Sequence, residues 1–342
     1  MPRVKKVKKE TRARAPLMAQ LFAALSDGTF HSGEALAKEL GVSRSAVWKA
    51  AGSLRALGTA LEAVRNRGYR LGHPSEPLEA ARIRAAIPRD VRGRIVSLET
   101  LWSTASTNTA LLARENPRPG TSEVLLAEFQ SAGRGRRGRS WLAPPGAGIC
   151  LSLSWTFPES PPELGALGLV IGVCVLRALK GLAAKDLALK WPNDLLAGGK
   201  KLGGILIELR GESAGPACVV IGIGLNVALG AELLRKIEAT GVLATDLAGA
   251  GLKSGSRNEV VAGIVSACVR GLTEFEREAL KPFLEEWRAA DALAGKEVNV
   301  SGAQGVAAGV ARGIDLHGAL LLETPQGLVQ RFISGDVSVR PT

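Results

Sequence analysis

Apolar residues recur at helical spacing in three short segments near the N-terminus, and each segment ends where helices commonly stop. The spacing predicts helices over Leu17–Leu25, Glu34–Leu40 and Ser43–Leu57. Ser32 stands just before the second helix and Ser43 opens the third, positions where a serine hydroxyl satisfies free helical N–H groups. The first part of the chain is therefore predicted to fold as three short helices joined by tight turns.

The second and third predicted helices have the spacing of a helix-turn-helix. Ala37 allows the helices to cross closely, Gly41 makes the turn, and Val47 packs the recognition helix. Arginine and serine at the start of such a helix are suited to base edges and phosphates. The exposed face of the recognition helix is predicted to present Ser43, Arg44, Ser45, Trp48 and Lys49.

A short hairpin is predicted directly after these helices. Leu61–Val64 and Gly68–Leu71 alternate as strands and flank the turn Arg65-Asn66-Arg67. A hairpin in this place is the wing of a winged helix, and Arg65 and Arg67 would lie where a phosphate backbone passes. The segment 16–73 is thus predicted to be a winged helix-turn-helix DNA-binding domain.

The distribution of charge agrees with this prediction. The chain of 342 residues has a formal net charge of +12, but residues 1–73 carry fourteen Lys and Arg against five Asp and Glu. The remaining 269 residues carry thirty against twenty-seven. Nucleic acid is the natural partner of so concentrated a positive charge. A basic, disordered tail over residues 1–15 accounts for only part of it.

The central segment, residues 79–292, alternates strand-like and helix-like patterns after a proline-rich linker at His73–Pro77. Several strands joined by short turns favour an α+β fold, in which helices cover a mixed sheet mainly on one side. The predicted helices are Leu78–Ile87, Thr109–Arg114 and Gly165–Leu179. The predicted strands are Gly93–Leu98, Val124–Gln130, the half-buried Ile149–Phe157, Leu187–Trp191, Lys200–Glu208 and Val219–Val227.

Short β segments separated by glycine-rich turns end the chain. Glu297–Ser301, Gly305–Ile314, Ala319–Glu323 and Leu328–Ser334 follow one another within about fifty residues. This spacing predicts a small SH3-like barrel over 293–342, with a packing or docking role.

Composition excludes several other classes of protein. The longest apolar stretch, Gly165–Leu179, is interrupted by glycines and is expected to be too short for a membrane span, and no apolar segment of a signal peptide opens the chain. Four cysteines lie far apart in apolar surroundings, and there are three histidines in all. We therefore expect buried free thiols, no metal held by protein side chains, and a cytoplasmic location.

A short loop carries the strongest chemical signal. Residues 130–141 contain three glycines and four arginines, in the order Gly-Arg-Gly-Arg-Arg-Gly-Arg from Gly133. Arginine grips phosphate and carboxylate oxygens in bidentate fashion, and glycine lets the backbone close around an anion. The loop also satisfies the G-x-G-x-x-G pattern, but Pro144-Pro145 follows where a dinucleotide fold needs a helix. An arginine-rich RNA patch would show repeats or interleaved aromatics, which are lacking here. We conclude that the loop binds a small, highly charged ligand.

Other candidates lie at the ends of predicted strands. Ser106-Thr107-Asn108 is a polar cluster that could equally be a plain helix cap. Lys190 stands at a strand end before Pro192, and its apolar flanks favour partial burial, where a bound anion would offset the cost of an unpaired ammonium. Gly222 and Gly224 lie inside a strand, a sign that another group approaches the backbone closely.

Together these segments resemble the bifunctional biotin protein ligases of bacteria, which also repress biotin operons. The similarity runs from residue 17 to residue 340, and the arginine loop and Lys190-Trp191-Pro192-Asn193-Asp194 are its most specific motifs. Other matching segments are Ser106–Asn108, Gln130, Lys201–Glu208, Gly313–Asp315 and Gly318–Glu323.

The resemblance implies a two-step reaction with biotin and ATP as substrates and Mg²⁺ carried by ATP. Biotin is first converted to biotinyl-5′-adenylate and then transferred to a lysine of a biotin carboxyl carrier protein. The resemblance makes Arg136 and Lys190 the catalytic residues. It assigns biotin contacts to Ser106, Thr107, Asn108, Gln130, Arg134, Gly135, Arg136 and Lys190, and adenylate contacts to Gly133, Arg137, Gly138, Arg139, Trp141, Asn193, Asp194 and Asn226.

The resemblance also implies regulation. The adenylate would favour a homodimer that places two winged helices on an inverted repeat of operator DNA, through Ser43, Arg44, Ser45, Lys49, Arg65 and Arg67. The chain departs from the family at Val227–Val242, which has no aromatic residue to cover adenine. Three alternatives stay open: a purely structural winged helix, a ligand-sensing repressor without catalysis, and a lipoate or octanoate ligase.

Overall fold

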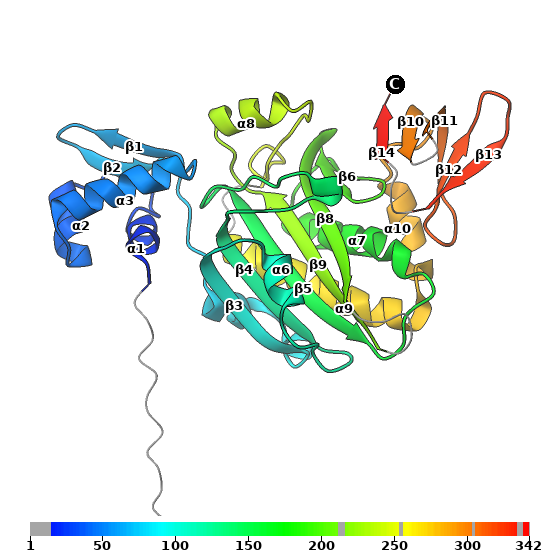
Figure 1. The fold of residues 1–342 in the computed structure, drawn as a ribbon, viewed down its shortest axis with the longest axis horizontal. Helices are drawn as coiled ribbons and strands as arrows, with labels where there is room; N and C mark the ends of the chain where they lie inside the picture. The colour runs from blue at the N-terminus through cyan, green and yellow to red at the C-terminus, as the bar shows by residue number, and fades with distance from the viewer. Residues whose placement is uncertain (1–14, 211–215, 253–255, 303–304, 334–337, 342) are drawn as a thin grey trace, which may run out of the picture.

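The computed structural model describes residues 15–210, 216–252, 256–302, 305–333 and 338–341. Three units follow one another along the longest axis of the molecule (Figure 1). A small helical unit at one end is joined by an extended segment to a large central sheet, and a small β unit packs at the other end. The predicted basic tail, apart from Ala15, lies outside the described residues.

The first unit is the predicted winged helix-turn-helix. Its helices are α1 (Leu17–Ala24), α2 (Gly33–Leu40) and α3 (Arg44–Ala56), followed by the wing strands β1 (Leu61–Val64) and β2 (Gly68–Leu71). The Ser32 hydroxyl accepts a hydrogen bond from the Ala35 N–H, and the Ser43 hydroxyl accepts one from Ala46. Gly41 takes the left-handed conformation that a short turn between helices needs. Both predicted caps and the turn are confirmed.

A separate apolar core holds this unit together. Leu21, Phe22, Leu36, Val47 and Leu54 are essentially inaccessible and belong to one cluster distinct from that of the central unit. The spacing of Val47 and Leu54 places both on the inner face of α3. The opposite face of α3 is consequently left in solvent.

The central unit is a seven-stranded mixed sheet in the order β3-β4-β5-β9-β8-β7-β6. β3 and β4 are parallel, and every other neighbouring pair is antiparallel. The strands are β3 (Ile95–Thr104), β4 (Ser122–Gln130), β5 (Gly148–Phe157), β6 (Leu187–Lys190), β7 (Asp194–Ala197), β8 (Lys200–Arg210) and β9 (Ala217–Asn226). The strands predicted at Lys200–Glu208 and Val219–Val227 correspond to β8 and β9, and their predicted pairing is confirmed.

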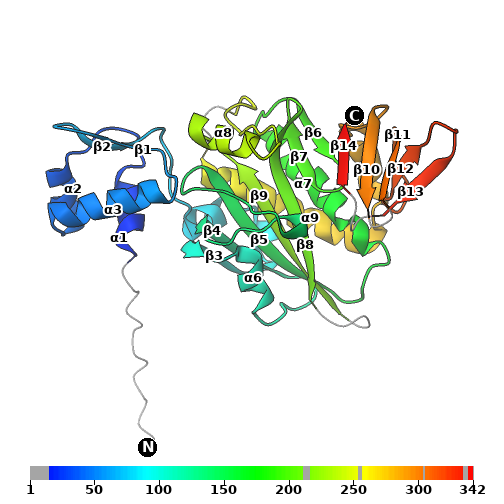
Figure 2. The ribbon, with the colours of Figure 1, turned by 45° about the horizontal axis from the view of Figure 1, so that its top comes forward.

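Helices cover the two faces of this sheet unequally. The long helices α7 (Leu167–Gly181) and α9 (Arg257–Glu278) pack against each other and, with α4 (Ala80–Ala86), cover one face, whereas α6 (Thr107–Leu112) lies on the other (Figures 1 and 2). The remaining helices are α5 (Arg89–Arg92), α8 (Ala231–Glu238), α10 (Leu284–Ala289) and the 3₁₀ turns Arg136–Gly138, Leu164–Ala166 and Lys281–Phe283. The face that carries α6 is thus covered by fewer helices than the opposite face.

Two interpretations of the sequence need correction here. The strand predicted as half-buried, β5, is buried along its whole length because α9 packs on one side and α6 packs on the other. The segment judged too short for a membrane does reach the length and hydropathy of a spanning helix over Leu164–Gly181, but 61% of it is buried within the fold. Burial of this extent is typical of a core helix in a folded domain.

The four cysteines, at 150, 174, 218 and 268, are free and buried, as the apolar surroundings predicted. Burial raises the pKa of Cys150 and of Cys174 to about 12. Their thiols are therefore protonated at neutral pH and are poor nucleophiles.

The last unit is a five-stranded antiparallel sheet in the order β13-β12-β11-β10-β14. Its strands are β10 (Glu297–Gly302), β11 (Gly305–Ile314), β12 (Leu320–Glu323), β13 (Val329–Phe332) and β14 (Ser338–Pro341). The strand β14 was not among the predicted elements. Val298 and Leu320 belong to the same apolar cluster as the central sheet, and the Trp191 indole N–H donates to the Gly318 carbonyl at 3.1 Å. The unit therefore packs directly behind the strand that carries Lys190.

Candidate active site

The arginine-glycine loop folds back on itself immediately after β4. The Gly135 N–H donates to the Arg139 carbonyl at 2.7 Å, and the Trp141 N–H donates to the Gly133 carbonyl at 2.9 Å. Between these bonds a single 3₁₀ turn, Arg136–Gly138, reverses the chain, with Arg137 at a φ of 56°. The loop is thus a small hairpin that presents its arginines on both sides.

Trp141 fastens this hairpin to the sheet. A Cβ atom on Gly224 of β9 would lie 2.5 Å from the indole Cε2, and one on Gly133 would lie 2.5 Å from the Trp141 carbonyl oxygen. Similarly, a Cβ on Gly222 would lie 2.5 Å from the Asn108 side-chain oxygen. The two strand glycines predicted to allow close approach therefore do so, for an indole and an amide respectively.

The contact between Trp141 and Gly224 leads to a testable expectation. Gly224→Ala should displace the indole and cost about 1–3 kcal/mol of the free energy of unfolding, because the new methyl overlaps ring atoms. The loss should appear as a lower midpoint of thermal unfolding. Gly263→Ala is the matched control, since a Cβ there meets only the Ala178 Cβ at 3.8 Å. Equal stability of the two variants would contradict this anchoring role.

A buried polar cluster lies where α6 meets β4 and β5. The Ser106 hydroxyl caps α6 by accepting from the Thr109 N–H at 3.4 Å, so the simple capping interpretation holds for this residue. Thr107 does more: its N–H and its hydroxyl both donate to the Gln130 side-chain oxygen, at 2.7 and 3.1 Å. The Ser152 hydroxyl contacts Thr107 Oγ1 at 2.7 Å and Asn108 Oδ1 at 2.6 Å. The structure thus brings the three predicted residues of α6 together with Gln130.

Sequence reasoning missed the acidic residue of this cluster. The Asn108 amide donates to Glu208 at 2.8 Å, and the Arg134 guanidinium donates to both oxygens of the same carboxylate at 3.0 Å. Glu208 stood in a segment noted as typical of a strand, without a role. The sequence could have indicated it, because Glu208 is an acidic residue near the end of a largely apolar strand. Ser152 is likewise a polar residue among the apolar residues of β5.

A second group of predicted residues surrounds the turn between β6 and β7. Lys190, half-buried, ends β6 and pairs in register with Asp194. Asn193 is held by its amide, which donates to the Ile205 carbonyl at 2.8 Å, and its side-chain oxygen lies 3.5 Å from Arg136 Nη1. The hairpin therefore reaches across the sheet from β4 to the turn that follows Lys190.

The remaining candidates of the site have structural partners or lie at the loop tip. Lys201 forms an ion pair with Asp194 at 2.6 Å, and the buried Asn226 amide donates to the Thr245 carbonyl at 2.9 Å. These contacts support the walls of the site. Three residues predicted near the adenylate lie at the exposed tip of the hairpin: Arg137, Gly138 and Arg139.

The predicted DNA-contacting residues lie on the winged helix, far along the molecule from these groups (Figure 1). The side chains of Ser43, Arg44, Ser45, Trp48 and Lys49 on α3, and of Arg65 and Arg67 on the wing, are exposed. The Ser43 hydroxyl serves as the helix cap, and the Arg67 guanidinium stacks on Phe30 at 4.1 Å from the ring centroid. The structure thus leaves these cations of α3 and the wing accessible to solvent.

The winged helix and the segment without an aromatic residue face each other across a cavity of about 590 Å³. Arg55 and Leu71 line it from the winged helix, and Leu233 and Lys236 line it from α8. The helix α8 also contributes Leu233, Leu234 and Ile237 to a small apolar cluster with Ala147. Aliphatic side chains therefore occupy the region in which an aromatic residue was expected.

Comparison with known proteins matches each unit to a family model. Residues 102–226 match the biotin/lipoate A/B protein ligase family, residues 18–70 match a helix-turn-helix domain, and residues 294–340 match the C-terminal domain of biotin protein ligases. The three matches follow one another in the order of the three structural units.

Relatives with known names resemble the chain over nearly its whole length. The bifunctional ligase/repressor BirA of Salmonella typhimurium is 37% identical over 94% of this chain and 96% of its own, and that of Escherichia coli is 36% identical over the same shares.

The fold is also similar to a solved structure, that of the biotin protein ligase of Aquifex aeolicus in complex with biotin and ATP. The two are 28% identical with a TM-score of 0.59, and the similarity covers 73% of this chain and 99% of the Aquifex chain.

The fold and the site define a biotin protein ligase that carries a helix-turn-helix domain. The identity and coverage then place the chain more narrowly: it belongs to the family of bifunctional biotin ligase/repressors.

Proposed function

We propose that the chain catalyses two consecutive reactions at the site described above. In the first, a carboxylate oxygen of biotin attacks the α-phosphorus of ATP, giving biotinyl-5′-adenylate and releasing pyrophosphate. In the second, the ε-amine of a lysine on a biotin carboxyl carrier protein attacks the activated carbonyl, forming the amide and releasing AMP. The reaction needs positioning and charge neutralisation, with no covalent intermediate on the enzyme.

We assign biotin to the buried cluster beside α6. Thr107, Gln130 and Asn108 offer donors and acceptors of the kind that a ureido group requires, on a rigid support of helix and strands. Lys190 and Arg136 neutralise the carboxylate and the α-phosphate, which otherwise repel each other. The other proposed biotin contacts are Ser106, Arg134 and Gly135.

We assign the adenylate to the region between the arginine hairpin and the turn after Lys190. We propose that Trp141, Asn193 and Asn226 contact the adenylate, and that Arg137 and Arg139 at the exposed tip of the hairpin close over the phosphates. The remaining proposed contacts are Gly133, Gly138 and Asp194. The aliphatic face of α8 is our proposed cover for adenine in place of an aromatic residue.

The proposed metal ion enters with ATP. Within the described ranges, no group of three His, Cys, Asp or Glu residues is arranged to hold a metal ion. Phosphate oxygens are hard ligands suited to Mg²⁺, which would neutralise the leaving pyrophosphate. The protein contributes the arginine and lysine charges around this complex.

A single observation carries this proposal: the arginine hairpin, anchored by Trp141 on Gly224, reaches the Asn193 turn next to Lys190. Its test is biotin-dependent exchange of pyrophosphate into ATP, with lipoate and octanoate as parallel substrates. Exchange with biotin alone supports the proposal. Exchange with lipoate would move the chain to the lipoate ligases, and no exchange with any of the acids would make it a ligand-sensing repressor.

We propose DNA binding as the second function, because the cations of α3 and the wing are exposed within a unit that matches a helix-turn-helix domain. The partner would be operator DNA with an inverted repeat, bound by a homodimer that forms when biotinyl-adenylate is present. We further propose a cytoplasmic location and the domain division 16–73, 79–292 and 293–342.

The wing provides a quantitative test of DNA binding. The double variant Arg65→Ala/Arg67→Ala should bind duplex DNA more weakly. The slope of log affinity against log salt concentration should also become shallower by about 2, because each phosphate contact contributes about 0.9 to the magnitude of that slope. Fluorescence anisotropy with a random-sequence duplex at several salt concentrations measures both quantities. Arg277→Ala on the remote helix α9 should leave the slope unchanged. A slope unaffected by the double substitution would favour a purely structural winged helix.

A further inference from the structure

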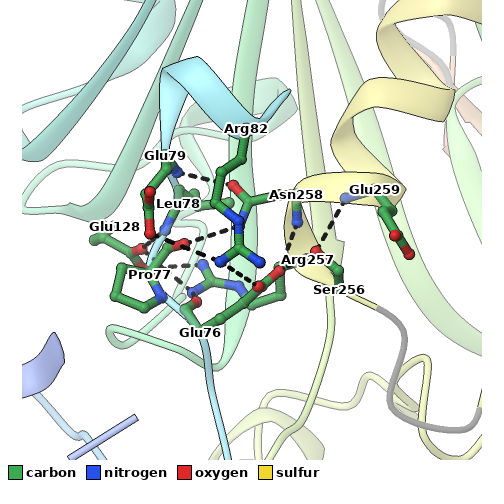
Figure 3. Close-up of polar contacts among 10 residues, drawn as sticks. All are labelled: Glu76, Pro77, Leu78, Glu79, Arg82, Glu128, Ser256, Arg257, Asn258 and Glu259. Atoms are coloured by element: carbon green, nitrogen blue, oxygen red, sulfur yellow. Dashed lines mark hydrogen bonds and ion pairs between the residues drawn. The ribbon is translucent and has the colours of Figure 1, made fainter. Parts of the chain in front are cut away.

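The segment that joins the winged helix to the central unit is held in place by side chains of two other elements (Figure 3). The Leu78 N–H donates to Glu128 of β4 at 2.6 Å, and the Glu79 N–H donates to Asn258 of α9 at 2.8 Å. The Asn258 amide returns a hydrogen bond to the Pro77 carbonyl at 3.0 Å. Consecutive backbone groups of the linker are therefore bonded to the interior of the central unit.

At the centre of this network is an ion pair that is almost completely buried. Arg257 and Glu128 expose 3% and 5% of their side chains, and Arg257 Nη2 lies 2.9 Å from Glu128 Oε2. The same guanidinium donates to the Gly148 carbonyl at 2.8 Å and to the Glu76 carbonyl at 3.0 Å. The planar guanidinium of Arg257 thus joins β4, the start of β5 and the linker. Because its geometry is fixed, it can form all of these hydrogen bonds only when the three segments are correctly placed relative to one another.

A second carboxylate closes the network on the linker side. Glu76 accepts hydrogen bonds from the Ser256 hydroxyl and from the Asn258 N–H at 3.0 Å, and it pairs with Arg82 at 3.1 Å. Burial raises the pKa of Glu76, but these hydrogen bonds outweigh it, and the pKa lies below its usual value. The carboxylate is therefore charged at neutral pH and holds the first turn of α9 against the linker.

The strands joined by Arg257 are those that lead into the proposed ligand site. Glu128 stands two residues before Gln130 on β4, and Gly148 pairs in register with Asn226 of β9. A ligand held by Gln130 restrains β4 close to Glu128, and one that contacts Asn226 restrains the start of β5 through its pairing with β9. Breaking one partner of a buried pair is strongly destabilising, so the three segments are expected to shift together or not at all.

We propose that Arg257 is a positioning residue that couples occupancy of the biotin site to the order of the linker carrying the winged helix. Through Glu128 it aligns β4, and through the Glu76 carbonyl it holds the linker. Ligand binding and linker order must then stabilise each other reciprocally. This inference rests on the site proposed above.

The test compares hydrogen exchange of the Leu78 and Glu79 amides with and without saturating biotin. In the unmodified chain, biotin should slow exchange of both amides by about tenfold. Arg257→Lys keeps the charge but has a single nitrogen, which cannot occupy the positions of both Nη1 and Nη2. The biotin effect should therefore fall below about twofold, and biotin affinity should weaken by about tenfold. If the planar guanidinium is required, lysine should restore neither the effect of biotin on amide exchange nor the affinity for biotin.

Arg270→Lys is the matched control. It lies on the same helix and its guanidinium donates twice to Asp90, at 2.8 and 3.0 Å, but both partners are largely exposed. This variant should retain the tenfold effect of biotin on the linker. Equal responses of the Arg257 and Arg270 variants would overturn the proposal.

A second variant covers the case in which Arg257→Lys fails to fold. Arg257→Met/Glu128→Leu replaces the buried pair by apolar side chains, which proteins often tolerate. The Glu79 amide, whose acceptor Asn258 is unchanged, should then exchange at the same rate with and without biotin. Persistence of the biotin effect in this variant would contradict the coupling. Absence of biotin binding to the unmodified chain would instead contradict the proposed site, and the two failures are therefore distinguishable.

Discussion

Replacement of Lys190 by methionine is expected to lower the rate of biotin-dependent pyrophosphate exchange by roughly 10²–10³-fold, the cost of removing one preorganised charge from a reacting centre. Lys190 ends β6 on a rigid support, between the buried Leu189 and Trp191. Methionine fills a similar volume without the charge. The loss should therefore fall on catalysis and not on the free energy of unfolding.

The control for this prediction lies in the same part of the sheet. Lys200→Met removes an exposed lysine at the start of β8 and should leave the exchange rate within about twofold. Thermal unfolding of both variants should occur near the temperature of the unmodified chain. An exchange rate of Lys190→Met equal to that of Lys200→Met would exclude Lys190 from the chemistry.

The parts of the fold that sequence alone predicts are those encoded locally. Ser32 and Ser43 cap their helices through hydrogen bonds to residues three positions away, and Gly41 forms its turn through its own backbone conformation. The turn of the wing likewise depends on the few residues between its two strands. For the same reason the strands around the arginine loop were recognisable. The long helix α9 was not predicted, although Val260, Ile264 and Cys268 repeat at a spacing of four and would have indicated it.

Residues whose roles depend on distant partners were missed. Glu208, Glu128 and Arg257 are charged, and a charged residue in a sequence is most simply interpreted as exposed. Their contacts are with partners between 74 and 129 positions away in the chain. No pattern of neighbours records such pairings, whereas the arginine loop is dense enough in one place to reveal itself. Local motifs therefore located the proposed site, and only the structure revealed the network that supports it.

The largest effect on the fate of the intermediate is expected from Arg136→Gly. The Arg136 guanidinium is the contact between the hairpin and Asn193, at 3.5 Å, and it would lie against the proposed phosphate. Its loss removes a charge-assisted contact and gives the loop further conformational freedom. We expect adenylate to form but to dissociate on the order of 10²-fold faster, a change of about 2.7 kcal/mol. The released mixed anhydride should then biotinylate lysines of bystander proteins, measured with streptavidin after incubation with serum albumin.

Arg137→Gly separates the effect of Arg136 from a general loosening of the hairpin. Arg137 is the next residue, it is exposed, and its φ of 56° is a conformation that glycine adopts readily. This variant loses the proposed phosphate contact of Arg137 but keeps the contact to Asn193 and relieves the backbone. Because an exposed ion pair contributes about 1 kcal/mol or less, we expect adenylate to dissociate at most about fivefold faster and labelling to stay largely on the carrier protein. If both variants released adenylate equally, retention would depend on the stiffness of the loop and not on the Arg136 side chain. Retention in both would place the seal over the adenylate elsewhere, with the aliphatic face of α8 as the next segment to vary.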